Sequence, residues 1–431
     1  DRVIACSHFM REQIADVFAL YEHREHTVTA LALDPLADPQ FVADFRSLHR
    51  YYKHTVFTKF QRHGPHLFMV FQTGRGPTDI KTFKWAVEDE RFVYLGNRFD
   101  HEFRYPPAQE VEWIRTHREL HRHGLHPHIS IEDRVFVECT GGDLTVKVED
   151  NTASGEGIYA EPVEQPDQTL DDAEIFYALV GSLILLRIRP YREERARYLV
   201  FNEKVKEVRR VDALADSCVL LPDEHGIVFP CGYYLQSGEF KQFETGVAGL
   251  VFHQRIASPN GEDHLYTFHH RETGEYLLLS YNVIARTVAP PLVCGGFSLF
   301  DNGQMAVFRT SPEPQKHHTL QIWQTPYVGL SWQPEMRPDS FLFRLGNPEL
   351  VRCLAEAQEV LTLLAKDDTF AGLYLDLVRR TTDIVDTYFW LGRPEAFALA
   401  EPLKEIRAAA DRALAEFDKV VRLRREAVTA L

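Results

Sequence analysis

Basic and aromatic side chains are concentrated between positions 45 and 78, a stretch without Asp or Glu in a chain whose net charge is −15. Lysine and arginine supply contacts to phosphates, and aromatic rings stack on bases. The stretch is therefore typical of a strip that contacts nucleic acid, and it would also suit an acidic partner protein. The alternative is a helix with an apolar core stripe and a solvated basic face. The candidate residues are Arg46, Arg50, Lys53, Lys59, Arg62, Tyr51 and Tyr52.

A second group of reactive side chains is a histidine cluster between positions 117 and 128. His117 and His121 are four residues apart, so both imidazoles could face one metal from a single helical turn, with His126 and His128 nearby. A zinc peptidase would need a glutamate directly after the first histidine, but Arg118 stands there. We therefore expect a solvated face and a turn, and predict no metal.

The chain lacks the motifs that hold nucleotides or activate a nucleophile. It contains no GxxxxGK[ST] loop, no GxSxG elbow, no strand-linked GxGxxG and no DxDxDG loop. We therefore expect no cofactor and no enzymatic activity in this chain. A metal-dependent hydrolase built on a propeller scaffold is retained as a second alternative.

Strand-turn-strand units recur about every 40 residues, and this spacing is typical of propeller blades. Asn-Gly and Gly-Gly pairs separate several runs, as expected for hairpins. The pattern predicts a mainly β protein with a β-propeller-like body of six or seven blades; a β-sandwich is the alternative. The clearest runs lie at 66–72, 134–140, 182–188, 226–232, 264–270 and 304–310.

Helical periodicity frames this body. Met10, Ile14, Val17, Phe18 and Tyr21 fit one face of a first helix, and a second should begin at Asp38-Pro39 with the stripe Phe41, Phe45, Leu48 and Tyr52. A further helix is expected over 107–124. The predicted domains are an N-terminal helical segment (1–54), a propeller-like domain (55–340) with the insertion 107–124, and a helical segment (341–431).

The last helix carries a heptad seam. Leu399, Leu403, Ile406, Ala410, Ala413, Phe417 and Val420 alternate at spacings of four and three residues. The seam favours a coiled coil, either dimeric or folded back within the chain. The alternative is a helix packed on its neighbours.

Composition limits the class of protein. The negative net charge disfavours wholesale wrapping of nucleic acid. No apolar run is long enough for a membrane span, and no signal peptide is visible. Six scattered cysteines without a CxxC pair indicate reduced thiols and a cytoplasmic protein. Because the chain begins at Asp1 and ends within a helical pattern, we expect a piece of a longer protein.

Several uncommon phrases occur together: GLHPHISIEDRVFVE at 124–138, GGDLTVKVEDNTASGEGIYAEPVE at 141–164, QTLDDAEIFYALVG at 168–181, SPNGEDHLYTF at 258–268 and HTLQIWQTPY at 318–327. The chain resembles the N-terminal region, a domain of unknown function, of large bacterial proteins described as DNA repair ATPases. The resemblance implies a cytoplasmic multidomain ATPase in which a coiled coil and an AAA-type ATPase domain follow this region. It implies no catalytic residue here.

These observations predict a non-enzymatic recognition or scaffold module. Its propeller surface would bind a partner protein, and its coiled coil would couple that surface to the ATPase region of the same polypeptide. Nucleic-acid contact through the strip 45–78 is the alternative function.

Overall fold

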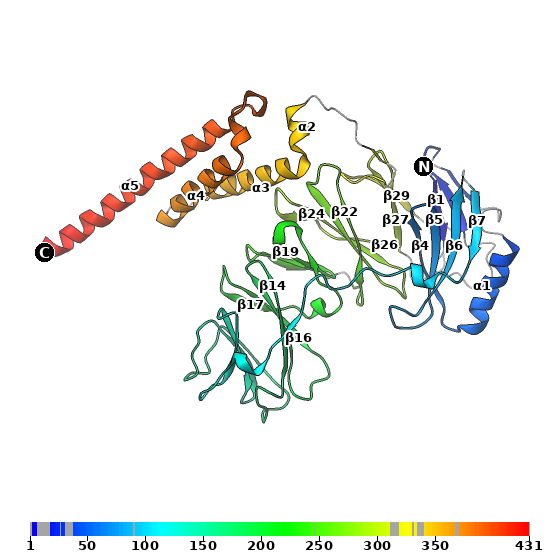
Figure 1. The fold of residues 1–431 in the computed structure, drawn as a ribbon, viewed down its shortest axis with the longest axis horizontal. Helices are drawn as coiled ribbons and strands as arrows, with labels where there is room; N and C mark the ends of the chain where they lie inside the picture. Colours follow the sequence, from blue (N-terminus) through cyan, green and yellow to red (C-terminus); the bar gives the residue numbers. More distant parts are fainter. Residues whose placement is uncertain are drawn as a thin grey trace.

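The computed structural model describes residues 2–6, 18–25, 27–30, 38–88, 91–244, 246–310, 319–329, 332–333, 340–366 and 370–430. Within these residues the chain forms seven antiparallel sheets and five α-helices (Figure 1). The mainly β fold class is thereby confirmed. The sheets follow one another along the chain, and the last three helices form an arm that projects from them (Figure 1).

Two sheets lie nearest the N-terminus. The first contains β1 (Arg2–Cys6), β2 (Phe18–Glu22) and β3 (Thr27–Ala30), and the second contains β4 (Val56–His63), β5 (His66–Gln72), β6 (Ile80–Glu88) and β7 (Arg91–Gly96). Between them lies α1 (Pro39–Tyr51).

The next two sheets have five strands each. One has the order β13-β12-β11-β10-β9 and contains β9 (His121–Arg122), β10 (His128–Ile131), β11 (Val135–Thr140), β12 (Asp143–Lys147) and β13 (Tyr159–Pro162). The other has the order β17-β16-β15-β14-β8 and contains β8 (Ile114–Arg115), β14 (Glu174–Val180), β15 (Leu183–Arg189), β16 (Arg197–Asn202) and β17 (Glu207–Arg210).

Three more sheets complete the β region. They contain β18 (Val219–Leu220), β19 (Gly226–Phe229), β20 (Gly232–Leu235) and β21 (Phe240–Gln242); then β22 (Val251–Ala257), β23 (Asp263–His269), β24 (Tyr276–Asn282), β25 (Thr287–Val288) and β26 (Leu292–Cys294); and finally β27 (Gly296–Leu299), β28 (Gln304–Phe308) and β29 (Leu320–Gln324).

The strands predicted from the repeat are confirmed, since each of the six runs overlaps a strand: β5, β11, β15, β19, β23 and β28. The predicted turns are confirmed as well. Their glycines have positive φ, a conformation that costs glycine little because it has no Cβ. These glycines are Gly141, Gly142, Gly261 and Gly303.

From the β9–β13 sheet onward, small hydrophobic clusters join each sheet to the next along the chain. Ile129 and Leu144 of one sheet share a cluster with Ile184 and Leu186 of the following sheet. Equivalent clusters join the β8/β14–β17 sheet to β18–β21, then β18–β21 to β22–β26, and β22–β26 to β27–β29. The three middle sheets of this series therefore bury side chains on both faces, and the series forms a continuous array.

The first predicted helix is wrong. Phe18 and Tyr21 lie in strand β2, which pairs with β1 and β3, while Met10, Ile14 and Val17 lie outside the described residues. Tyr21 packs against Phe300 of the array. A short apolar stripe fits a strand as well as a helix, and the available strand partners decide between them.

The helix predicted over 107–124 is also wrong. This segment contains β8, the short 3₁₀ turn Arg118–Leu120, and β9. Its backbone pairs with neighbouring sheets: Glu110 donates its N–H to Cys218 O at 2.8 Å, and Ile114 pairs with Tyr177 of β14. Strand partners from distant positions thus satisfy amides that a helix would have bonded internally.

The C-terminal helices were predicted correctly in type. They are α2 (Phe341–Leu345), α3 (Asn347–Leu364), α4 (Ala371–Thr387) and α5 (Ala400–Ala430). Five seam positions of α5 are partly or fully buried, namely Leu403, Ile406, Ala410, Ala413 and Phe417. They face the neighbouring helices of the arm: Leu403, Ile406 and Ala410 share one core with α3 and α4, and the Phe417 ring lies 5.8 Å from that of Tyr374.

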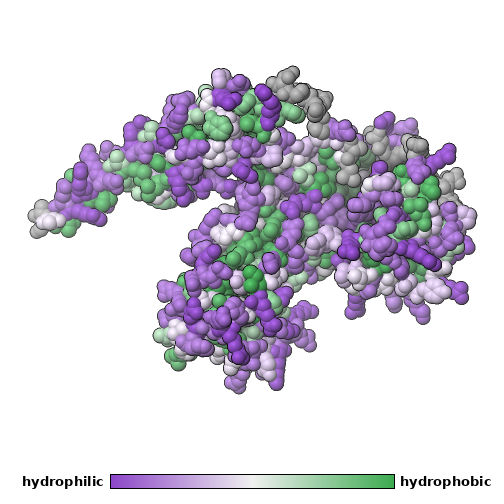
Figure 2. Space-filling view, viewed as in Figure 1, coloured by the Kyte–Doolittle hydropathy of each residue, from purple (hydrophilic) through white to green (hydrophobic). Residues whose placement is uncertain are grey.

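The last third of α5 has no such neighbour among the described residues. Val420, Val421, Leu423 and Val428 are about half exposed or more. Figure 2 shows hydrophobic residues continuing along α5 toward the C-terminal end. The seam therefore serves helix packing within the chain up to Phe417.

Cysteine burial agrees with the sequence. Cys139, Cys218, Cys294 and Cys353 are buried thiols. Burial raises the pKa of Cys139 to about 12 and that of Cys353 to about 11. Separately, none of the helices in the described ranges has the length and apolar character needed to cross a lipid bilayer.

Candidate functional site

Helix α1 positions the first candidate site. The Asp38 carboxylate caps the helix by accepting the Gln40 N–H at 2.7 Å, and Pro39 occupies the first turn, as predicted. Phe41, Phe45 and Leu48 are buried against one face of sheet β4–β7. Because that stripe faces the sheet, the basic side chains of α1 point toward solvent.

The exposed end of α1 carries what we call the α1 patch: Arg46, Arg50, Tyr51, Tyr52 and Lys53. All five side chains are exposed, and Tyr51 is 76% accessible. Among the described residues, none of the three basic groups lies within ion-pair distance of a carboxylate. The patch thus combines free cations with an open aromatic ring, the groups that contact phosphates and bases.

The remaining two residues of the predicted strip lie elsewhere. Arg62 is near the far end of β4, where its Nε donates to Gly64 O at 3.2 Å, about 20 Å along the strand from Val56. Lys59 is buried, with 4% exposure. A β-bulge at Thr58 causes this: Phe57 pairs with Phe71 but Lys59 pairs with Val70, so Lys59 points to the face opposite α1. The single strip predicted over 45–78 is therefore divided into three parts.

The first two predicted metal candidates do not share a helix. His117 is exposed and lies 3.5 Å from the Glu119 carboxylate, while His121 is half-buried in strand β9. Burial lowers the pKa of His121. Because the segment is extended on both sides of its single 3₁₀ turn, the predicted spacing of one helical turn does not apply.

The other two histidines pair with carboxylates. His126 Nδ1 lies 3.0 Å from Glu138, and His128 Nε2 lies 2.8 Å from Asp150. Glu138 in turn bonds the buried Lys147 at 2.6 Å. Across the parts of the chain that the structure describes, no group of three His, Cys, Asp or Glu side chains is arranged to hold a metal ion. The His128–Asp150 pair anchors the loop after β12 to β10, and the His126–Glu138 pair anchors the segment before β10 to β11.

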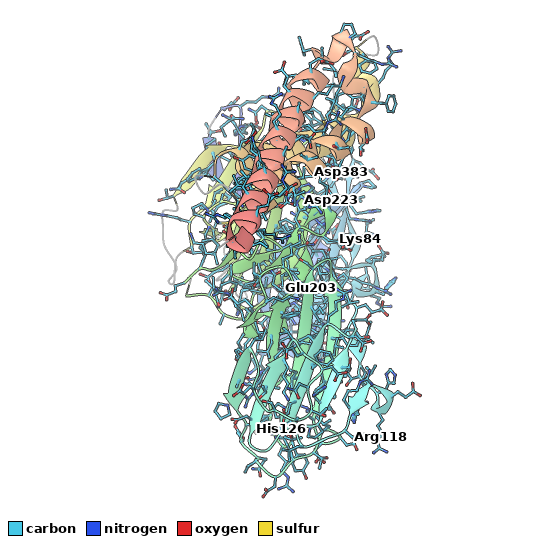
Figure 3. The ribbon with its side chains drawn as sticks, turned by 90° about the vertical axis from the view of Figure 1, so that its left-hand side faces the viewer. Lys84, Arg118, His126, Glu203, Asp223 and Asp383 are labelled. Carbon is cyan, nitrogen blue, oxygen red and sulfur yellow. The ribbon has the colours of Figure 1, made fainter. Side chains whose placement is uncertain are left out.

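The two candidate regions lie far apart. Figure 3 shows His126 and Arg118 at one end of the array, well separated from Lys84 of sheet β4–β7. A third feature, which we did not predict from the sequence, is a shallow hollow of about 280 Å³ over β14–β16. Arg187 lies 4.0 Å from the Phe176 ring there, and Arg189 pairs with Glu174 at 2.8 Å. Arg187 and Arg189 stand at alternate positions of β15, and this spacing was the signal in the sequence that could have located the hollow.

The structure thus defines a β-rich array with a helical arm, an exposed basic patch and half-buried histidine–carboxylate pairs. The family described as "ATPase involved in DNA repair" matches residues 4–389. The chain belongs to this family, so the resemblance seen in the sequence is confirmed. No curated protein matches the chain.

Solved structures with some likeness to the chain include three of low similarity. The mitotic checkpoint complex aligns over 72% of this chain and 84% of its own, at 11% identity and a TM-score of 0.23. Kluyveromyces lactis Hsv2p aligns over 62% and 97%, at 10% identity and a TM-score of 0.16. The tricorn protease aligns over 74% and 38%, at 10% identity and a TM-score of 0.14. At these scores the likeness carries no assignment of fold or function.

Proposed function

We propose that the chain is a non-enzymatic recognition and scaffold module of a larger ATPase. Its array of sheets presents a surface to a protein partner, and its helical arm couples that surface to the ATPase region of the same polypeptide. We further infer that the array is propeller-like. Successive sheets packed in chain order support this inference, with an opening between the β9–β13 sheet and sheet β4–β7 (Figure 1).

The observation that carries the proposal is the double burial of α3. Val351 and Ala355 pack into the core of β18–β26, whereas Cys353 and Val360 pack into the core of the arm. One 18-residue helix therefore belongs to two hydrophobic cores at once. A helix held on two faces cannot swivel freely, so the arm has a fixed orientation relative to the array.

Charged groups reinforce the same junction. Glu359 continues the α3 face that begins at Val351 and Ala355, since the three are four residues apart. Its carboxylate pairs with Arg286 of the β24–β25 turn and with Arg380 of α4. One carboxylate thus bridges the array and the arm.

The coupling can be tested by measuring the distance between two dyes. Fluorophores on Glu194→Cys, in the array, and Asp411→Cys, on α5, should give a narrow distance distribution by single-molecule energy transfer. Ala355→Glu places a charge in the core between α3 and β18–β26, and it should broaden the distance distribution. Ala409→Glu, on the exposed side of α5, is the matched control and should not. An unchanged distribution in Ala355→Glu would refute the coupling.

The partner half of the proposal needs a separate experiment. The purified ATPase region of the same polypeptide should be retained by the immobilised chain in mild salt. The Ala355→Glu variant should retain less of it. If the chain and the ATPase region do not associate at all, the scaffold role loses its support.

The α1 patch favours a second function, contact with nucleic acid. Fluorescence anisotropy with single- and double-stranded oligonucleotides across a salt series would test it. Three phosphate contacts predict a log–log slope of about −2 for single strands. Reversing Arg46, Arg50 and Lys53 to Glu should remove this binding, whereas reversing Arg412, Lys419 and Arg424 on α5 changes net charge equally and should not. Unchanged affinity of the patch variant would exclude this role.

A further inference from the structure

A group of buried and half-buried cationic and polar side chains lies where sheet β4–β7 meets the β22–β26 sheet. We call it the seam cluster: Lys59, Tyr105, His253, His269 and Arg271. Lys59 Nζ lies 5.3 Å from the centre of the Tyr105 ring, and Arg271 Cζ lies 4.3 Å from the same ring. Two cations from different sheets therefore share one aromatic side chain.

The two cations have no acidic partner. Among the described residues, no carboxylate lies within ion-pair distance of Lys59 or Arg271. Arg271 Nε is buried without a hydrogen-bond acceptor, and so is the Tyr105 hydroxyl. A buried charge without a counter-charge costs several kcal/mol in general, so such positions are rare unless something neutralises them.

The histidines add further unpaired groups. His269 is 1% exposed, and neither of its ring nitrogens has a hydrogen-bond partner in the described structure. His253 Nδ1 lies 3.0 Å from Thr267 Oγ1, and the two imidazole centres are 6.1 Å apart. Burial, and then the charge of Lys59, lowers the pKa of both rings well below the usual value. Each neutral ring can still donate one N–H.

Two β-bulges place side chains in this cluster. The register of β4 shifts between Phe57 and Lys59, and that of β22 shifts between Phe252 and Gln254, which is where His253 lies. Bulges re-aim single side chains and are frequent beside functional sites. Thr58 also contacts the opposite sheet, with its Oγ1 3.5 Å from Arg271 O.

We propose that the seam cluster is a binding site for a phosphate group. Lys59 and Arg271 supply two positive charges, which match a phosphate dianion, and its oxygens would accept from Lys59 Nζ, Arg271 Nε, the Tyr105 hydroxyl and His269. The phosphate could be inorganic or the terminal group of a nucleotide.

The charge balance gives the site a defined pH dependence. Burial, and then the nearby Arg271, lowers the pKa of Lys59 to about 7. The other titratable side chains here are those of His253, His269, His270, Tyr105 and Tyr276. None of them carries a negative charge at neutral pH. A bound dianion favours the charged lysine, so binding takes up a proton above pH 7 and affinity should fall between pH 7 and 9.

The test measures calorimetric binding of inorganic phosphate, adenosine monophosphate and a short oligonucleotide to the whole 431-residue chain at pH 7 and constant ionic strength. Lys59→Met should weaken binding at least tenfold. Lys84→Met is the matched control, because Lys84 is a buried lysine on the same sheet that already has a carboxylate partner, Glu102.

Each outcome decides the proposal. Binding that depends on Lys59 but not on Lys84 supports it, and the ligand that binds identifies the source of the phosphate. No binding of any of the three ligands, or equal binding by both variants, would overturn it. Arg271→Gln gives a second test if Lys59→Met folds poorly, and thermal unfolding without phosphate reports on folding.

Discussion

The two faces of sheet β4–β7 bury different kinds of side chains. The face toward α1 is a cluster of aromatic and aliphatic side chains, including Phe71, Phe83 and Trp85. The opposite face carries two buried lysines, Lys59 and Lys84, beside Phe68 and Val70. A sheet needs one apolar face for stability; a second face that buries charge costs stability and therefore indicates another role.

The two lysines differ in a single respect. Both are less than a tenth exposed, and both lie over aromatic rings of the segment after β7. Lys84 bonds Glu102 at 2.5 Å, but Lys59 meets Arg271 and two histidines. The Glu102 carboxylate neutralises the buried lysine Lys84. Lys59 instead lies near a second cation, Arg271, and we therefore assign its counter-charge to a ligand.

The largest change in stability is expected from a substitution on the apolar face of sheet β4–β7. Trp85 is fully buried, with its ring 4.9 Å from that of Phe41. Trp85→Ala should lower the free energy of unfolding by about 3–5 kcal/mol, measured by urea denaturation, because it leaves a cavity. Trp323→Ala, at a position 46% exposed, is the control and should cost far less. Similar losses for both would mean that the α1 face is not the main core of this sheet.

The next effect concerns the pH dependence of stability. Because the pKa of Lys59 is about 7 when folded and about 10.4 when unfolded, the unfolded chain binds more protons between these values. Without phosphate, stability should therefore rise with pH, by up to about 1.4 kcal/mol per unit from this group. Urea unfolding of the unsubstituted chain and of Lys59→Met between pH 7 and 8.5 isolates the contribution of Lys59 to the slope of stability against pH. Parallel curves for both proteins would contradict the lowered pKa.

Substituting each of the two buried lysines should change stability by a smaller amount, and the two changes should have opposite signs. Lys84→Met removes a partly solvated ion pair and should cost about 1 kcal/mol at pH 7. Lys59→Met removes an unpaired charge and should raise stability by about 1 kcal/mol in phosphate-free buffer. Thermal unfolding of both variants in one buffer measures this. The comparison fails if the two shifts have the same sign.

The smallest change in stability is expected for Tyr105→Phe. The ring that both cations contact remains, and only a buried hydroxyl without a partner is lost. Stability should change by less than about 0.5 kcal/mol. Affinity for phosphate should fall about tenfold, as expected for one lost hydrogen bond to a charged ligand. Retained affinity would remove Tyr105 from the site but leave the cations in it.

Local signals in the sequence correctly located many elements. Alternating apolar residues marked strands such as β5 and β23, and glycine pairs marked the turns between them. Asp38 and Pro39 marked the start of α1, and the heptad spacing marked α5. These predictions hold because they depend on backbone conformation and on burial within a few residues along the chain.

The site depended on information that is not local. Sequence spacing placed Lys59 with Arg46 and Arg50, but the bulge at Thr58 turned it to the opposite face. The histidine spacing suggested one helical turn, but the backbone of 107–124 pairs with β10 and β14 instead. In both places a partner strand distant in sequence determined where the side chain points.

The sequence by itself therefore determined the β-rich class, the hairpins, α1 and the helical arm. Only the tertiary structure decided which charges are exposed, which are buried, and that Lys59 and Arg271 meet without a carboxylate. The physical reason is that secondary structure follows from nearby residues, whereas the environment of a charge depends on every element packed against it.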